Sequence, residues 1–155
     1  MAGRPAQREG TMHHVGRFAC LLVVLFTTSA YALMAPEFYR QARAEAAFHV
    51  QVAIDKVTPP AKGPGSCMVE GKVAEVFKDA GNKLPAGTPV SFSVACHGAG
   101  EQVPIGGAMW TDTEALKSAK YIEVYLVPGV NGYAIAMWNS KIIAAPSKTP
   151  QFPVD

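Results

Sequence analysis

Apolar and polar residues alternate with period two along several stretches of the chain. Residues 48–57 show the pattern most strictly, which is typical of a strand with one buried face. The face that we expect to be buried carries Phe48, Val50, Val52 and Ile54. Gly71 interrupts the next stretch, where we expect a bulge or a bend. The other predicted strands cover residues 67–77, 89–96, 120–127 and 133–143.

Two stretches predict helices instead. Residues 33–47 are rich in helix-forming residues, and Pro36 suits a first turn. Their apolar stripe consists of Phe38, Tyr39, Ala42 and Ala46. A second helix of about two turns is predicted from Thr111, because Thr111 and Glu114 have the spacing of a capping box. Asp112 between them suits the first turn of a helix.

The order of these elements predicts the fold class. Three strands, a short helix and two more strands is the order of the OB-fold, a five-stranded Greek-key barrel. We therefore predict a mainly β protein with an OB-like barrel over residues 48–144, a short helix between strands three and four, and an N-terminal helix over residues 33–47. Residues 145–155 contain three prolines, and we expect them to form a flexible tail.

The last two predicted strands are apolar on both faces, as in "YIEVYLV" and "YAIAMW". A barrel strand has one inner face, so something must cover the outer face of these two. The apolar stripe of the N-terminal helix is the favoured cover, because aromatic stripes usually belong to a core. A partner protein or a ligand, held by tyrosine and tryptophan anchors, is the alternative.

The N-terminal residues have the layout of a secretory signal peptide. A lead with Arg4, Arg8 and Arg17 precedes the apolar run "FACLLVVLF", and "SAYA" supplies an A-x-A cleavage site that ends at Ala32. We predict a signal peptide over residues 1–32, and Met12 is an alternative start. An uncleaved anchor is the rival interpretation, but a membrane-spanning helix needs about 20 apolar residues. We expect no stable membrane span after cleavage.

Removal of the leader changes the charge. The whole chain has 14 Lys and Arg and 12 Asp and Glu, and residues 1–32 contain three Arg and one Glu. The remaining chain therefore has 11 of each and a formal net charge of zero. A neutral domain lacks the basic surface that binding to nucleic acid or to an acidic membrane requires.

Two cysteines remain in the exported chain, Cys67 and Cys96. Export places them in an oxidising compartment, where a pair of cysteines forms a disulfide by default. A hairpin that turns near residues 81–82 brings both to the same end, within disulfide reach. A haem or zinc site lacks the necessary spacing. A nucleophile formed by Cys96 and His97 is disfavoured, because neighbours in a strand point to opposite faces.

Other residue patterns point to no chemistry. The glycine-rich residues 98–107 do not match a dinucleotide-binding fingerprint, and His49 is interpreted as a solvated residue on a polar strand face. No Ser–His–Asp set and no metal-ligand cluster can be read from the spacing. We therefore predict a non-catalytic protein with no cofactor and no metal.

Two segments carry a resemblance to a known family. They read "MVEGKVAEVFKDAGNKLPAGTPVSFSVAC" and "YIEVYLVPGVNGYAIAMWNSKII". They resemble the netrin-like branch of secreted OB-fold modules, which includes tissue metalloproteinase inhibitors. Those inhibitors act through a cysteine at the mature N-terminus, whereas the first mature cysteine here is Cys67, so the resemblance implies the fold and no functional residue. The chain also resembles small exported bacterial proteins that have no assigned activity.

These observations predict an exported, non-catalytic binding protein of the periplasm or extracellular space. An accessory subunit of a cell-envelope complex, with another envelope or extracellular protein as partner, is one alternative. A hydrolase or redox enzyme whose site is not readable from motifs is another. OB-folds bind ligands on the sheet face of strands 2 and 3 and at the loops here formed by residues 58–66 and 128–132. The candidate ligand-binding residues are Lys72, Tyr125 and Trp138.

Overall fold

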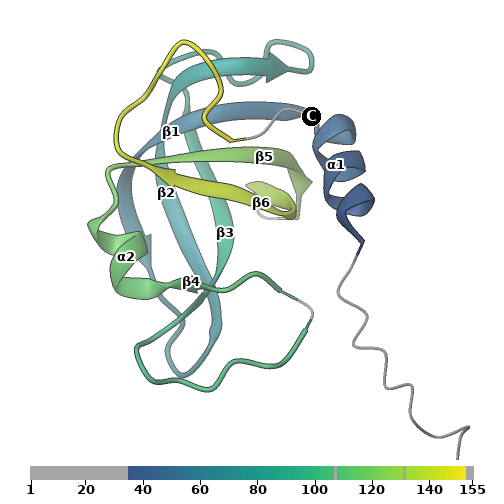
Figure 1. The fold of residues 1–155 in the computed structure, drawn as a ribbon. Helices are drawn as coiled ribbons and strands as arrows, with labels where there is room; N and C mark the ends of the chain where they lie inside the picture. Colours follow the sequence, from purple (N-terminus) through teal and green to yellow (C-terminus); the bar gives the residue numbers. More distant parts are fainter. Residues whose placement is uncertain (1–34, 107, 131, 153–155) are drawn as a thin grey trace, which may run out of the picture. The chain divides into compact units, whose positions relative to one another are not determined.

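Five long strands close into a barrel in the computed structural model, which describes residues 35–106, 108–130 and 132–152. The predicted signal peptide, residues 1–32, lies outside the described residues. The long strands are β1 (Phe48–Thr58), β2 (Gly65–Asp79), β3 (Pro89–His97), β5 (Tyr121–Gly129) and β6 (Gly132–Ile143). A two-residue strand β4 (Thr111–Asp112) lies outside the barrel, and the helices are α1 (Pro36–Glu45) and α2 (Thr113–Ser118). The predicted fold class is confirmed (Figure 1).

The order of strands around the barrel is that of an OB-fold. The sheet runs β2-β1-β5-β6-β3, and the pairing of β2 with β3 closes it. All neighbours in the barrel are antiparallel except β3 and β6, which pair in parallel through Phe92↔Tyr133 and Ser93↔Ala134. The helix α2 connects β3 and β4 to β5, as predicted. Because β2 pairs with β3, the closed barrel has no long unpaired strand edge.

Period-two alternation places one side of every long strand inside the barrel. The inner face of β1 carries Phe48, Val50 and Val52, all at most 1% exposed. They pack in one cluster with Val69, Phe92, Val124 and Leu126 of the other strands. Gly71 lies where the β1–β2 register shifts, and a Cβ there would collide with the carbonyl oxygen of Ala53. The bulge or bend predicted at this glycine is therefore present.

The cysteine pair lies inside the same core. The Sγ atoms of Cys67 and Cys96 are 2.01 Å apart, which is the separation of a disulfide. The register differs from the one we expected, because Cys67 faces Val94 and Cys96 faces Gly65. The bridge therefore joins diagonal neighbours of β2 and β3, with Cα atoms 5.7 Å apart. Both cysteines are fully buried.

The outer face of β5 and β6 is covered from within the chain, as the favoured interpretation expected. The helix α1 lies beside these strands (Figure 1). Ala42 and Ala46 pack with Tyr125 and Ala136, whereas Phe38 at the start of the helix is 50% exposed. The C-terminal half of the predicted stripe therefore does the covering.

Residues 145–152 belong to the segment that we expected to form a flexible tail. They form a strap that crosses β1 and returns toward α1 (Figure 1). The main-chain N–H groups of Ser147, Gln151 and Phe152 all donate to buried side chains of the barrel. Hydrogen bonds to buried acceptors order a backbone that its prolines alone would leave free.

The cap of α2 differs as well. Thr111 lies in β4, and the side chain of Asp112 accepts a hydrogen bond from Ala115 N at 2.8 Å, so Asp112 is the N-cap. The predicted capping box of Thr111 with Glu114 is wrong. Asp and Thr both cap helices well, and here the pairing of Thr111 with Cys96 draws it into the sheet.

The strand β6 contains a bulge that the sequence did not predict. Leu126 pairs with Ile135 and Val124 pairs with Ser140, so residues 136–139 lie opposite the single residue Tyr125. Met137 and Trp138 adopt positive φ angles of 43° and 59°. A side chain in this left-handed region costs about 1–2 kcal/mol per residue. Within the bulge Asn139 is buried, and its Nδ2 donates to Tyr39 O of α1.

Candidate ligand-binding pocket

A pocket of about 620 Å³ opens where α1 meets the barrel. Side chains of α1, β1, β2 and β5 and one residue of the strap line it. We call it the α1 pocket, and its lining consists of Arg40, Arg43, Ala44, His49, Val76, Phe77, Lys78, Tyr125 and Pro150. Small-molecule sites in proteins are clefts of about 300–1,000 Å³ with a mainly apolar lining and a few polar groups.

The floor of the pocket is a buried pair of polar side chains. His49 is 3% exposed and Glu123 is fully buried, and His49 Nε2 lies 2.8 Å from Glu123 Oε1. The His49 ring stacks on Tyr125, with centroids 3.8 Å apart and an interplanar angle of 15°. Phe77 packs against the other side of the ring, at 4.8 Å. The imidazole is therefore fixed in position by two rings and one carboxylate.

Four donors converge on the Glu123 carboxylate. Oε1 accepts from His49 Nε2 at 2.8 Å and from Phe152 N at 2.9 Å, and Oε2 accepts from Gln51 Nε2 at 2.7 Å and from Gln151 N at 2.9 Å. Burial disfavours the charge, but the four hydrogen bonds outweigh burial, so the pKa of Glu123 lies below its ordinary value. The carboxylate is ionised at neutral pH and acts as acceptor alone.

His49 is neutral at neutral pH. Burial, the largest effect, and the charge of Lys78 together lower the pKa of His49 by more than the hydrogen bond and the charge of Glu123 raise it. Because Glu123 can only accept, Nε2 of His49 carries the imidazole proton. The floor of the α1 pocket therefore presents an uncharged ring that donates to an ionised carboxylate, which four hydrogen bonds stabilise.

The strap holds one side of the site. Gln51 Oε1 accepts from Ser147 N at 2.8 Å, so the same buried amide that donates to Glu123 also binds the strap. The Phe152 ring meets Tyr125 edge-on with centroids 5.9 Å apart, and the Arg43 guanidinium lies 5.7 Å from its centroid. The strap therefore joins the outer face of β1 and β5 to α1.

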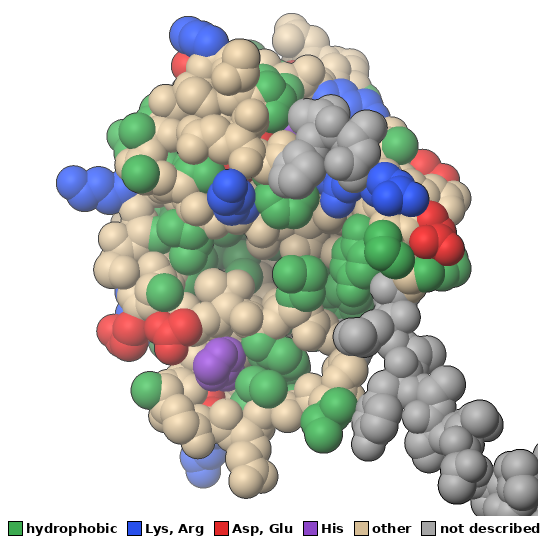
Figure 2. Space-filling model, in the orientation of Figure 1, with side chains coloured by type: hydrophobic (Ala, Val, Ile, Leu, Met, Phe, Trp, Pro, Cys, Tyr) green, Lys and Arg blue, Asp and Glu red, His purple; other side chains and the backbone are tan. Residues whose placement is uncertain are grey.

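The wall of the pocket is basic. Arg40, Arg43 and Lys78 line it, and no carboxylate does. Lys78 Nζ donates to Ala44 O at 2.7 Å, which holds the ammonium at the C-terminal end of α1. Arg43 Nη1 donates to Asn139 Oδ1 at 3.1 Å, so the β6 bulge positions this guanidinium. Lys and Arg side chains gather on the visible face beside α1 (Figure 2).

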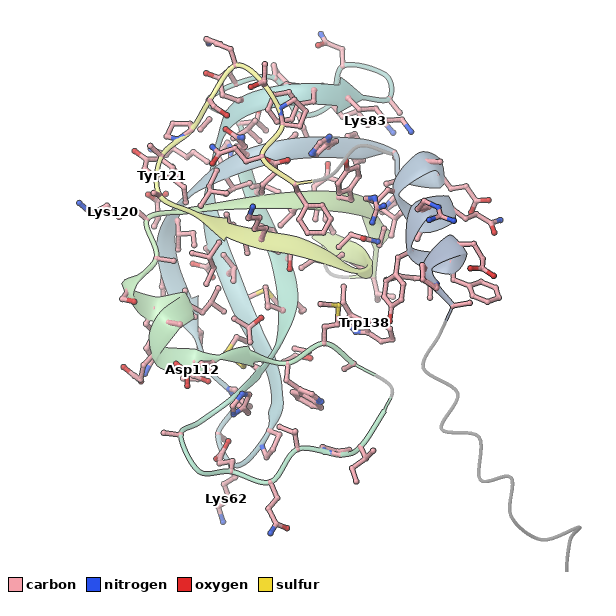
Figure 3. All side chains as sticks on the ribbon, viewed as in Figure 1. Lys62, Lys83, Asp112, Lys120, Tyr121 and Trp138 are labelled. Atoms are coloured by element: carbon pink, nitrogen blue, oxygen red, sulfur yellow. A yellow bond between two sulfur atoms is a disulfide. The ribbon has the colours of Figure 1, made fainter. Side chains whose placement is uncertain are left out.

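The three candidate ligand-binding residues from the sequence do not come together. Tyr125 lines the α1 pocket. Lys72 is exposed on β2, opposite Ala53 and Pro89. Trp138 lies in the bulge of β6, next to the loop that precedes β4 (Figure 3), and lines a small pocket of about 180 Å³ with Ser93 and Met109. The structure thus brings one of the three to the candidate site.

The sequence analysis missed the residues of the floor. His49 was interpreted as solvated, but it is buried, because the strap and α1 cover the outer face of β1. Gln51 and Glu123 face each other directly in the β1–β5 register. The available signal was Glu123 itself, a single acid within a strand that is apolar on both faces. A buried acid needs partners, and the polar face of β1 offers them.

The lining limits the chemistry of the pocket. It contains no Ser, Thr or Cys that could act as a nucleophile. Within the described part of the chain, no group of three or more His, Cys, Asp or Glu could hold a metal ion. The arrangement can bind and orient a ligand through two guanidinium groups, an ammonium and an aromatic stack, and His49 is a group suited to proton transfer.

No protein-family model matches the chain, and no characterised protein or solved structure is significantly similar to it. The resemblance to netrin-like modules therefore stays a prediction. Among the helices that the structure describes, none is long and apolar enough to cross a membrane. The disulfide fits an oxidising compartment.

Proposed function

We propose that this chain is an exported, non-catalytic binding protein of the periplasm or extracellular space, and that its ligand occupies the α1 pocket. One observation carries the proposal: a basic, partly aromatic pocket stands on a floor whose polar groups are already paired. Such a floor is preorganised, because His49 and Glu123 need no rearrangement to accept a ligand.

The leader pattern and the disulfide support export. The segment "FACLLVVLFTTSAYA" fits a signal peptide, and a buried disulfide suits an oxidising compartment. The buried position of Cys67 and Cys96 also argues against a redox role, because reactive cysteines are partly exposed.

A hydrolase is the second candidate, and the His49–Glu123 pair is the observation that favours it. A histidine oriented by a carboxylate is the usual arrangement of a general base. The binding role is preferred because His49 is packed between two rings and is 3% exposed, and because no Ser, Thr or Cys lines the pocket. A hydrolase here would have to activate water directly.

Native mass spectrometry of the protein recovered from cells tests the proposal. Ala44 is exposed and lines the pocket, so Ala44→Trp should block it, whereas Ala115→Trp on α2 makes the same change far from it. We expect a small-molecule adduct on the wild type and on Ala115→Trp, and its loss from Ala44→Trp. Equal retention by both variants would reject the pocket. A co-purifying protein in place of a small adduct would favour the accessory-subunit alternative.

A further inference from the structure

The charges around the α1 pocket are unevenly distributed. The exported chain has a formal net charge of zero, yet the pocket is lined by three cations and no acid. The Glu123 carboxylate, which does not line the pocket, contacts His49 and accepts four hydrogen bonds. The positive field of the wall is therefore not cancelled by the lining, and a cavity with low-dielectric walls focuses such a field on what it binds.

Two of the cations retain unused donors. Arg40 is exposed and makes no hydrogen bond or ion pair to any residue that the structure describes. Lys78 donates one hydrogen bond, to Ala44 O, and an ammonium has three donors. A guanidinium and an ammonium that face one cavity form a site for an oxyanion, because guanidinium binds carboxylate and phosphate in a bidentate manner.

The rest of the lining is flat and apolar. Phe77 and Tyr125 lie on either side of His49, and Val76 and Pro150 add aliphatic surface. These groups offer no further charge to a ligand. The volume of about 620 Å³ exceeds what an inorganic anion needs, so the anionic head must belong to a larger body.

Together, these features define a ligand class. We infer that the α1 pocket binds a small organic anion with a carboxylate or phosphate head and a flat apolar body. The head lies at Arg40 and Lys78, and the body lies along Phe77 and Tyr125. This inference rests on the proposed function, because it names the ligand of the same site.

Four probes with one body and different heads test the ligand class. They are 2-naphthoate, 2-naphthyl phosphate, 2-naphthalenemethanol and 2-naphthylmethylammonium. Titrations followed by NMR on the full exported chain report both the dissociation constant and the place of binding, through the resonances of His49, Phe77 and Tyr125. We expect the dissociation constants of the two anions to be at least about tenfold lower than that of the alcohol, because one hydrogen bond to a charged group contributes about that factor. The ammonium should bind most weakly. Whichever anion binds more tightly identifies the head as carboxylate or phosphate.

Matched variants test the position of the head. Lys78→Met and Arg40→Gln should each weaken the better anion by about tenfold, and neither should change binding of the alcohol. Lys72→Met, on the same strand but outside the pocket, should change neither. Arg40→Gln keeps the test valid if Lys78→Met disturbs α1, because Arg40 makes no contact that the fold needs.

The outcomes separate the two proposals. If the alcohol or the ammonium binds the pocket as tightly as the anions, the ligand class is wrong, and the binding function of the pocket stands. If Lys78→Met and Arg40→Gln bind the anions as the wild type does, the ligand class is also wrong. If no naphthyl probe moves a pocket resonance, the inference is overturned, and the adduct on the recovered protein then decides the proposed function independently.

Discussion

The carboxylate of Glu123 lies 2.8 Å from Nε2 of His49, across two neighbouring strands and beyond the reach of solvent. The two residues are 74 positions apart in the chain, and they meet because β1 and β5 are antiparallel neighbours. The same carboxylate binds the main chain of the strap at Gln151 and Phe152. One acidic side chain therefore ties together the floor of the pocket and the C-terminal segment that covers it.

The first prediction concerns the stability that this acid provides. Glu123→Gln keeps the size of the side chain but removes the charge on which four donors depend, so we expect the free energy of unfolding to fall by about 2–4 kcal/mol. Glu114→Gln on α2 removes an exposed ion pair with Lys117 and should cost at most about 0.5 kcal/mol. Urea unfolding of both variants checks this, and equal effects would contradict it.

The pH dependence of stability has a definite sign. The pKa values of His49 and Glu123 are both lower in the folded than in the unfolded chain, so the unfolded chain binds more protons. Stability is therefore full above the unfolded pKa and is lost as pH falls, first below 6.5 for His49 and then below 4.5 for Glu123. A tenfold difference in proton affinity corresponds to about 1.4 kcal/mol.

Urea unfolding between pH 7.5 and pH 5 measures the histidine part. The wild type should lose stability over this interval, and His49→Gln should show a smaller slope because it has no imidazole to protonate. An unchanged slope in His49→Gln would show that other groups cause the pH dependence.

The strap should be protected from hydrogen exchange. The amides of Gln151 and Phe152 donate to a buried carboxylate, and opening them should cost on the order of 2 kcal/mol or more. Hydrogen exchange followed by NMR measures this directly, and Glu123→Gln should remove most of the protection. Exchange of these amides at the rate of an unfolded chain would mean that the strap is a free tail, as the prolines first suggested.

The disulfide should be present in the protein recovered from cells and should stabilise it. The bridge closes a loop between residues 29 positions apart, which is worth about 3–4 kcal/mol in the chain-entropy model. We expect the double variant Cys67→Ala, Cys96→Ala to lose about this amount in urea unfolding. Thiol blocking before lysis, followed by mass measurement, checks the bond itself. Two blocked thiols would contradict it.

Most of the barrel could be predicted from the sequence, because period-two alternation acts locally. The strands and the bend at Gly71 follow from residues close together in the chain, and the cysteine pair follows from the number of cysteines that remain after the leader. The pairing register of β2 and β3 could not be predicted, because the turn between these strands is long and its geometry sets the register. Cys67 faces Val94 instead of Cys96 for this reason.

The candidate pocket could not be predicted, because three distant segments build it. His49 becomes buried once α1 and the strap cover β1, and neither contact leaves a periodic signal. The bulge at Met137 and Trp138 positions Arg43 through Asn139, and no glycine lies at or next to it. Tyr125 was predicted as an anchor because it is aromatic and lies on the outer face of a strand that is apolar on both faces.

A crystal structure of the protein recovered from cells, with no ligand added, would show the occupant of the α1 pocket. We expect electron density for a small organic anion there, with its head at Arg40 and Lys78 and its body along Phe77 and Tyr125. Density for a co-purified ligand beside Trp138 or over Lys72, with the α1 pocket filled by water, would contradict this expectation.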